Sequence, residues 1–120
     1  MTYTEKEIIE LFGKNKNAVG YIRVDNGGEA SDSIRMQEHT INMFCKKLKI
    51  KCENFYKDIG VSGLNFKRTA WKEMLKNEKN KVVLVANLSR ISRKFEDLLK
   101  LNKDTDKIFI SINDGLLIKK

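Results

Sequence analysis

The feature that most constrains this chain is an uninterrupted run of five apolar residues, VVLVA, at positions 82–86. A short run that is apolar throughout is typical of a strand buried on both faces, and such strands occur in parallel sheets covered by helices on two sides. One strand of this kind cannot be stable alone. The rest of the chain therefore has to supply neighbouring strands and two layers of helices.

The remaining sequence meets this requirement. Strands are expected at 18–24, 50–56 and 107–112, and helices at 4–12, 33–48, 68–77 and 92–101. Ser33 is expected to cap the second helix, and the strand at 50–56 is the least apolar, which favours the edge of a sheet. The alternation predicts an α/β domain with three layers, in which helices cover both faces of a mostly parallel sheet of four to five strands. Residues 1–17 are expected to be an N-terminal helical extension of a domain at 18–120.

Length and charge narrow the possible functions. The chain has 120 residues, the size of one domain, and 24 Lys and Arg against 16 Asp and Glu give a net charge of +8. Such a surplus favours a polyanionic partner, most simply nucleic acid, although a well-solvated lysine-rich surface is the alternative. Lys46, Lys47 and the lysines at 119–120 are interpreted as solvated faces.

The sequence also indicates a compartment and argues against a metal site. Two cysteines and no secretory signal favour a reducing, cytoplasmic protein, and no apolar stretch is long enough for a membrane helix. Cys45 and Cys52 lack further ligands at zinc spacing, so we expect two buried thiols.

Ligands of open α/β sheets bind beyond the carboxyl ends of the strands. Tyr21, Arg23 and Asp25 share one side of the first strand, and an arginine within a central strand is costly unless it is paired. The position favours a functional site, and the alternative is a structural Arg23–Asp25 pair at the strand end.

Three further arginines and a glutamine are expected near the same edge. Arg90 and Arg93 are three residues apart after the buried strand, and Arg68 begins the preceding helix. One guanidinium group can bind two phosphate oxygens at once, which favours a phosphate site. The alternative is two solvated surface arginines, which would give the same sequence pattern. Gln37 lies on an apolar helix stripe from which it could reach the loop after residue 24, and a satisfied core glutamine is the alternative.

Several short motifs occur together in order: Tyr-Ile-Arg-Val at 21–24, Ser33 with Gln37, Asp58 with Ser-Gly at 62–63, Arg68, Leu-Ser-Arg-Ile-Ser-Arg at 88–93 and Asn-Asp-Gly at 113–115. In order and spacing they resemble the catalytic domain of the serine site-specific recombinases, the resolvase/invertase family, over about residues 18–115.

The resemblance implies a chemistry. In that family a serine at the end of the first strand attacks a DNA phosphodiester, forms a covalent phosphoserine link and later reverses the reaction, without a metal or other cofactor. The residues that the resemblance assigns to binding and stabilising the DNA phosphate are Arg23, Arg68, Arg90 and Arg93. Those that it assigns to supporting roles at the site are Gln37, Asp58 and, in the adjacent phosphate-binding loop, Ser62.

The sequence departs from the family at the nucleophile, because Asp25 stands where the serine is expected. Attack by a carboxylate would have to expel a DNA alkoxide and form a high-energy acyl phosphate, and its charge would repel the phosphate by about 4 kcal/mol at ~4 Å and an effective dielectric constant of ~20. We therefore expect a recombinase domain that is inactive in cleavage, and Asp25 leaves open whether the chain is an enzyme. Ser31 is a weaker candidate for a replacement nucleophile.

Two other functions remain open at this stage. The domain could be a regulatory or partner-binding module that dimerises with a related recombinase. Alternatively, Asp25 and Asp58 could hold Mg²⁺ for phosphoester hydrolysis. The family's long dimerisation helix and DNA-binding domain are expected after the Asn-Asp-Gly turn and are absent from these residues, so full-length relatives are expected to be oligomers and this chain could be a monomer.

Overall fold

A five-stranded sheet runs through the centre of the molecule, in the strand order β2-β1-β3-β4-β5. The computed structural model describes residues 2–25, 30–60 and 68–119, without the side chains of residues 30, 31, 102 and 104. The strands are β1 (Asn17–Val24), β2 (Lys51–Ile59), β3 (Val82–Val85), β4 (Ile108–Ser111) and β5 (Leu116–Ile118). The helices are α1 (Glu5–Phe12), α2 (Ala30–Leu48), α3 (Thr69–Lys76) and α4 (Phe95–Asp104), with a 3₁₀ turn η1 (Leu88–Arg90).

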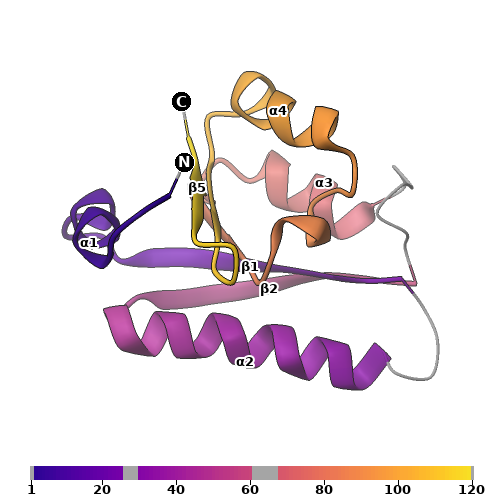
Figure 1. Ribbon diagram of the computed structural model, residues 1–120, viewed down its shortest axis with the longest axis horizontal. Helices are drawn as coiled ribbons and strands as arrows, with labels where there is room; N and C mark the ends of the chain where they lie inside the picture. The colour runs from indigo at the N-terminus through magenta and orange to yellow at the C-terminus, as the bar shows by residue number, and fades with distance from the viewer. Residues whose placement is uncertain (1, 26–29, 61–67, 120) are drawn as a thin grey trace.

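Helices cover the two faces of this sheet, as the sequence predicts. β1 pairs in parallel with β2 and β3, and β3 pairs in parallel with β4. Figure 1 shows α2 on one side of β1 and β2, with α3 and α4 on the other side. The α/β class, the mostly parallel sheet and the edge position of β2 are confirmed.

Two apolar clusters hold the layers together, one on each face. Ala18 and Ile22 of β1 join the cluster that contains α1 and α2 residues, whereas Val19 and Tyr21 join the cluster that contains Met74 of α3. All four residues of β3 are buried, in agreement with the interpretation of the VVLVA run. The alternation of β1 therefore places Arg23 on the α3 and α4 side of the sheet.

Helix α1 is part of the same packed structure. A capping box is present at its start, because the Thr4 hydroxyl accepts from the Glu7 backbone N–H and the Glu7 carboxylate accepts from the Thr4 N–H. Ile8 and Phe12 are buried in the α2-side cluster. Within the described residues, no helix is both long and apolar enough to cross a membrane.

Two predicted helix starts are wrong. α2 begins at Ala30, so Ser33 is not the cap and its hydroxyl instead accepts a 3.2 Å hydrogen bond from Gln37 Nε2. α4 begins at Phe95 rather than at Ser92, because the Ser92 hydroxyl accepts from the Lys94 backbone N–H and donates to Asp97. That serine forms a turn before the helix.

Two strands also differ from the prediction. β2 continues to Ile59, which places Asp58 inside the strand and opposite Arg23 in register. β5 was not predicted as a strand, and it pairs antiparallel with β4 after the turn at Gly115. A three-residue strand carries too little periodicity to be recognised in sequence.

Gly20 marks a close approach between β1 and β2. A Cβ atom at this position would lie 2.7 Å from the Phe55 ring and 3.3 Å from Ile41. We predict that Gly20→Ala lowers the free energy of unfolding by about 1–2 kcal/mol, because the added methyl group forces the ring outward. Urea denaturation monitored by circular dichroism measures this change.

A double variant provides the control. Phe55→Leu vacates part of the space at the ring. The double variant should therefore lose less free energy of unfolding than the sum of the losses of the two single variants. An unfolding midpoint for Gly20→Ala equal to that of the wild type would show that this contact does not constrain the residue.

Candidate functional site

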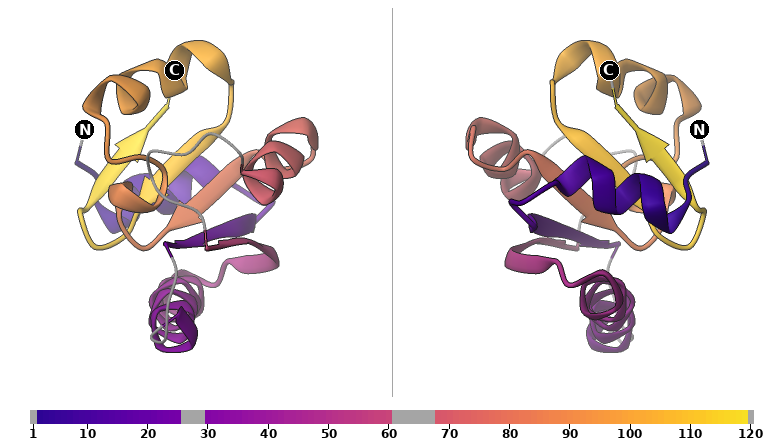
Figure 2. Two further views of the ribbon diagram at one scale, coloured as in Figure 1. Left: turned by 90° about the vertical axis from the view of Figure 1, so that its right-hand side faces the viewer. Right: turned by 90° about the vertical axis from the view of Figure 1, so that its left-hand side faces the viewer.

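Arg23 is the buried centre of the site. Its side chain is 0% exposed at the carboxyl end of β1, the edge that faces the viewer in the left panel of Figure 2. Its Nη2 donates to the Ser89 carbonyl at 2.6 Å and its Nε donates to the Arg90 carbonyl at 3.1 Å. A buried guanidinium group is tolerated because these acceptors and a carboxylate replace water.

Asp25 supplies that carboxylate and joins two arginines. One oxygen accepts from Nη1 of Arg23 and the other accepts from Nη2 of Arg93. The Asp25 side chain is 35% exposed and that of Arg93 is 50% exposed, so the bridge lies at the surface. Partial burial acts to raise the pKa of Asp25, but the hydrogen bond and charge of Arg23, together with Arg93, outweigh it and lower the pKa below that of an ordinary carboxyl.

Arg90 and Gln37 converge on the backbone of β1. Gln37 Nε2 donates to the Arg23 carbonyl at 3.2 Å, and Arg90 Nη1 donates to the same oxygen at 3.1 Å. Gln37 therefore reaches the end of β1, as the sequence predicts. Gln37 Oε1 and Arg90 Nε are buried with no hydrogen-bond partner among the described residues. Burial, and then the charge of Arg23, lowers the pKa of Arg90.

Asp58 lies on β2, opposite Arg23 in register, and caps α3. Its carboxylate accepts from the Tyr21 hydroxyl at 2.7 Å and from the backbone N–H groups of Ala70 at 2.9 Å and Trp71 at 3.1 Å. Burial, followed by the hydrogen bond to Asp58, raises the pKa of Tyr21 strongly. The carboxylate satisfies the open N–H groups of the helix start, so Asp58 positions α3.

Arg68 begins α3 and connects it to the η1 segment. It is buried, it contacts the Ile91 carbonyl, and its guanidinium carbon lies 6.0 Å from the centre of the Trp71 ring. A cavity of about 180 Å³ lies beside Arg68, Trp71 and Ile91. The carbonyl that Arg68 contacts therefore belongs to the residue next to Arg90, which itself contacts Arg23.

Arg90 and Arg93 are three residues apart but do not lie in one helix. Arg90 ends η1, and Arg93 precedes α4. They meet at the end of β1 because the turn between them bends around it, with one arginine on the Arg23 carbonyl and the other on Asp25. Ser62 and the side chain of Ser31 lie outside the described part of the structure.

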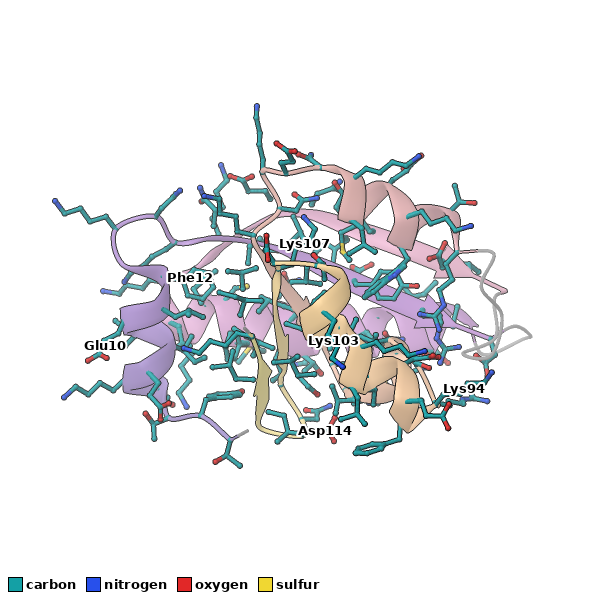
Figure 3. The ribbon with its side chains drawn as sticks, turned by 90° about the horizontal axis from the view of Figure 1, so that it is seen from above. Glu10, Phe12, Lys94, Lys103, Lys107 and Asp114 are labelled. Carbon is teal, nitrogen blue, oxygen red and sulfur yellow. The ribbon has the colours of Figure 1, made fainter. Side chains whose placement is uncertain are left out.

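Asp114 and Tyr21 make contacts at the site that their sequence context does not predict. The Asp114 carboxylate accepts from the Leu88 N–H at 2.8 Å and from the Ser111 hydroxyl at 2.7 Å, so the turn after β4 holds the start of η1. Figure 3 labels Asp114 at this turn. An aspartate in an Asn-Asp-Gly turn signals a local backbone contact, but its partner 26 residues earlier is visible only in the fold.

The arrangement is suited to holding an anion. Arg23, Arg90 and Arg93 surround the end of β1, and the anion that is present is the carboxylate of Asp25. Asp25 and Asp58 bond to different partners, two arginines in one case and Tyr21 with the α3 backbone in the other. This pattern does not fit a pair of carboxylates that share one Mg²⁺ ion.

Comparisons with known proteins agree with this geometry. The family model described as Resolvase, N terminal domain matches residues 18–115. No curated protein matches the sequence. The N-terminal catalytic domain of TP901-1 integrase is similar in structure, with 29% identity, a TM-score of 0.76, and coverage of 85% of this chain and 82% of that chain.

Two further crystal structures have the same fold. The C-terminal catalytic domain of ISC1926 TnpA, an IS607-like serine recombinase, is 26% identical with a TM-score of 0.66, over 80% of this chain and 67% of that chain. A resolvase family site-specific recombinase from Streptococcus pneumoniae is 23% identical with a TM-score of 0.69, over 84% and 74%. The chain belongs to the resolvase family of serine recombinases, and residues 18–115 are its match to that family's N-terminal domain.

Proposed function

We propose that this chain is a cytoplasmic serine-recombinase catalytic domain that acts on DNA and has lost strand cleavage because Asp25 occupies the nucleophile position. The observation that carries this proposal is the bridge from the Asp25 carboxylate to Arg23 and Arg93. An active member of the family needs a neutral hydroxyl here and needs the arginines for the phosphate.

The bridge opposes cleavage in two ways. A DNA phosphate would have to displace a carboxylate that already has two charged partners, and the two anions would repel each other by about 4 kcal/mol at ~4 Å and an effective dielectric constant of ~20. Nucleophilic attack by Asp25 would also produce an acyl phosphate, whose higher energy favours the return of the DNA strand. Binding and chemistry are therefore both disfavoured.

The residues around Asp25 retain an arrangement suited to a phosphate. In this proposal Arg23, Arg90 and Arg93 contact the phosphate, and the buried Nε of Arg90 is a donor that has no partner among the described residues. Gln37 and Asp58 act as positioning residues, the first through the Arg23 carbonyl and the second through α3, which carries Arg68 at its start. Ser62 remains a proposed phosphate contact outside the described residues.

An exposed apolar surface favours a second candidate function. Phe95 is 72% exposed and Leu99 is 60% exposed on α4. They border a groove of about 370 Å³ that also contains Leu88, Leu98 and Leu116. Exposed apolar surface of this kind is typical of a protein–protein interface. The alternative is thus a non-catalytic module that dimerises with a related recombinase through this groove.

Restoring the nucleophile tests the main proposal. We predict that the wild-type protein forms no covalent adduct with DNA, whereas Asp25→Ser forms one, because the hydroxyl can attack and the arginines are released for the phosphate. The measurement is a denaturing gel of protein mixed with a fluorescent, nicked duplex of randomised sequence. Asp25→Ala is the matched control, since it loses the carboxylate without gaining a nucleophile. A stable adduct with the wild-type protein would contradict the proposal.

The partner-binding alternative has a separate test. If the α4 groove is an interface, the double variant Phe95→Ser with Leu99→Ser should weaken association with a related recombinase by tenfold or more while leaving the thermal midpoint within about 2 °C. Analytical ultracentrifugation of mixtures measures the association. A wild-type chain that stays monomeric with that recombinase present would exclude this function.

A further inference from the structure

The charge surplus of the chain is concentrated in four short segments, which comprise helix ends, strand starts and the turns between them. Residues 14–16, 46–51, 76–81 and 103–107 together contain 11 lysines and three acidic residues, which gives 11 − 3 = +8. The whole chain also has a net charge of +8, so all other residues sum to zero. A surplus spread over the surface at random would not collect in these segments.

The fold brings the four segments to one edge of the sheet. Each lies at the amino end of a parallel strand: Lys16 precedes β1, Lys51 opens β2, Lys81 precedes β3 and Lys107 precedes β4. The Lys51 N–H donates to the Lys16 carbonyl at 2.7 Å, and the Ile108 N–H donates to the Lys81 carbonyl at 2.8 Å. This edge is on the side that faces the viewer in the right panel of Figure 2, where α1 crosses in front of part of it, and it lies opposite the edge with the arginines.

Most of these lysines are free to meet a partner. We use the name lysine edge for Lys14, Lys16, Lys46, Lys49, Lys51, Lys76, Lys79, Lys81 and Lys103, of which all but the partly buried Lys16 are exposed. Lys47 is excluded because it pairs with Glu5 of α1. Glu53 and Glu78 lie near or within this edge, and Glu5, Glu7 and Glu10 are exposed on α1 in front of it, so these carboxylates offset part of its charge.

Lys107 fixes the backbone of the segment that carries two of the exposed lysines. Its Nζ donates to the Asn77 carbonyl at 2.9 Å and to the Asn80 carbonyl at 2.6 Å, and burial lowers its pKa. Asn80 Nδ2 in turn donates to the Tyr56 hydroxyl and to the Met74 carbonyl. The turn that presents Lys79 and Lys81 is therefore held in place before any partner binds. Lys103 and Lys107 are labelled in Figure 3.

We propose that the lysine edge is a second nucleic-acid surface, which binds the backbone of duplex DNA without reading its sequence. β2, β1 and β3 are neighbouring strands at about 4.8 Å spacing, so Lys51, Lys16 and Lys81 are spread across about 10 Å, which is comparable to the ~12 Å width of the major groove. Among the described residues, Phe95 is the aromatic member of the exposed large apolar side chains. It lies at the start of α4, away from the lysine edge. A surface without exposed aromatic rings fits a duplex backbone better than stacked single-stranded bases.

The lysine edge has a simpler structural role that the test must separate from binding. Lysines near helix ends stabilise α2, α3 and α4 through the negative ends of their dipoles. That role predicts an effect on stability without an effect on DNA binding. The proposal does not depend on Asp25, so it stands whether or not the arginine site cleaves DNA.

The experiment compares two triple variants of equal charge by fluorescence anisotropy with a 30-base-pair duplex of arbitrary sequence. Lys51→Gln with Lys79→Gln and Lys81→Gln removes the centre of the lysine edge. Lys57→Gln with Lys72→Gln and Lys119→Gln removes lysines elsewhere, none of which lines the cavity beside Arg68. We expect the first triple variant to lose about tenfold in affinity at 50 mM salt and about three units of the slope of log K against log salt. The second should lose less than twofold.

Other results would overturn the proposal. Equal losses in the two triple variants would assign binding to overall charge, and no binding by the wild-type protein at 50 mM salt would remove the surface altogether. Tighter binding to a single strand of the same length, or to vesicles of anionic lipid, would point to a different partner. The same measurements on Asp25→Ser separate the two sites, because the loss caused by the edge variant should be unchanged in that background.

Discussion

The buried guanidinium group of Arg23 is the interaction on which the rest of the site depends. It is 0% exposed on β1, a central strand of the sheet. It donates hydrogen bonds to two backbone carbonyls of η1 and to one carboxylate. Its own carbonyl receives Gln37 from α2 and Arg90 from η1. One residue thus connects β1, α2 and the segment after β3. A charge so deeply buried holds these elements in one arrangement, because any movement would leave it without an acceptor.

The parallel sheet gives the molecule two chemically different ends. At the carboxyl ends of the strands lie hydrogen-bonded arginines, from the fully buried Arg23 to the half-exposed Arg93, arranged around one carboxylate. At the amino ends lie exposed lysines on helix ends, strand starts and turns. Arginines with fixed donors suit one phosphate in one geometry, whereas flexible lysines suit a line of phosphates in many geometries. The two ends therefore fit different tasks on the same kind of polymer.

Much of the fold could be predicted from the sequence because its main signals are local. The VVLVA run predicted the buried strand β3, and the low apolar content of 50–56 predicted an edge strand. The start of α4 and the strand β5 could not be predicted, since one depends on the Ser92 hydroxyl in a turn and the other on pairing with β4. The Arg23–Asp25 contact could be predicted because the two side chains share one side of the first strand. The contact of Gln37 with the end of β1 could be predicted because Gln37 lies on the apolar face of its helix. The role of Asp58 did not, because the strand extends beyond its apolar part and the α3 N–H groups that it caps are distant in sequence.

The central claim is that Asp25 occupies the place of a phosphate between Arg23 and Arg93. The most direct measurement is a titration with inorganic phosphate, followed through the ¹⁵N–¹H NMR signals of the arginine Nε groups in the wild-type protein and in Asp25→Ala. The account predicts that the Arg93 signal of the wild-type protein stays in place, while that of Asp25→Ala shifts and saturates over the same phosphate concentrations. A wild-type signal that shifts with the affinity of the variant would contradict it, because the carboxylate would then not occupy the phosphate position.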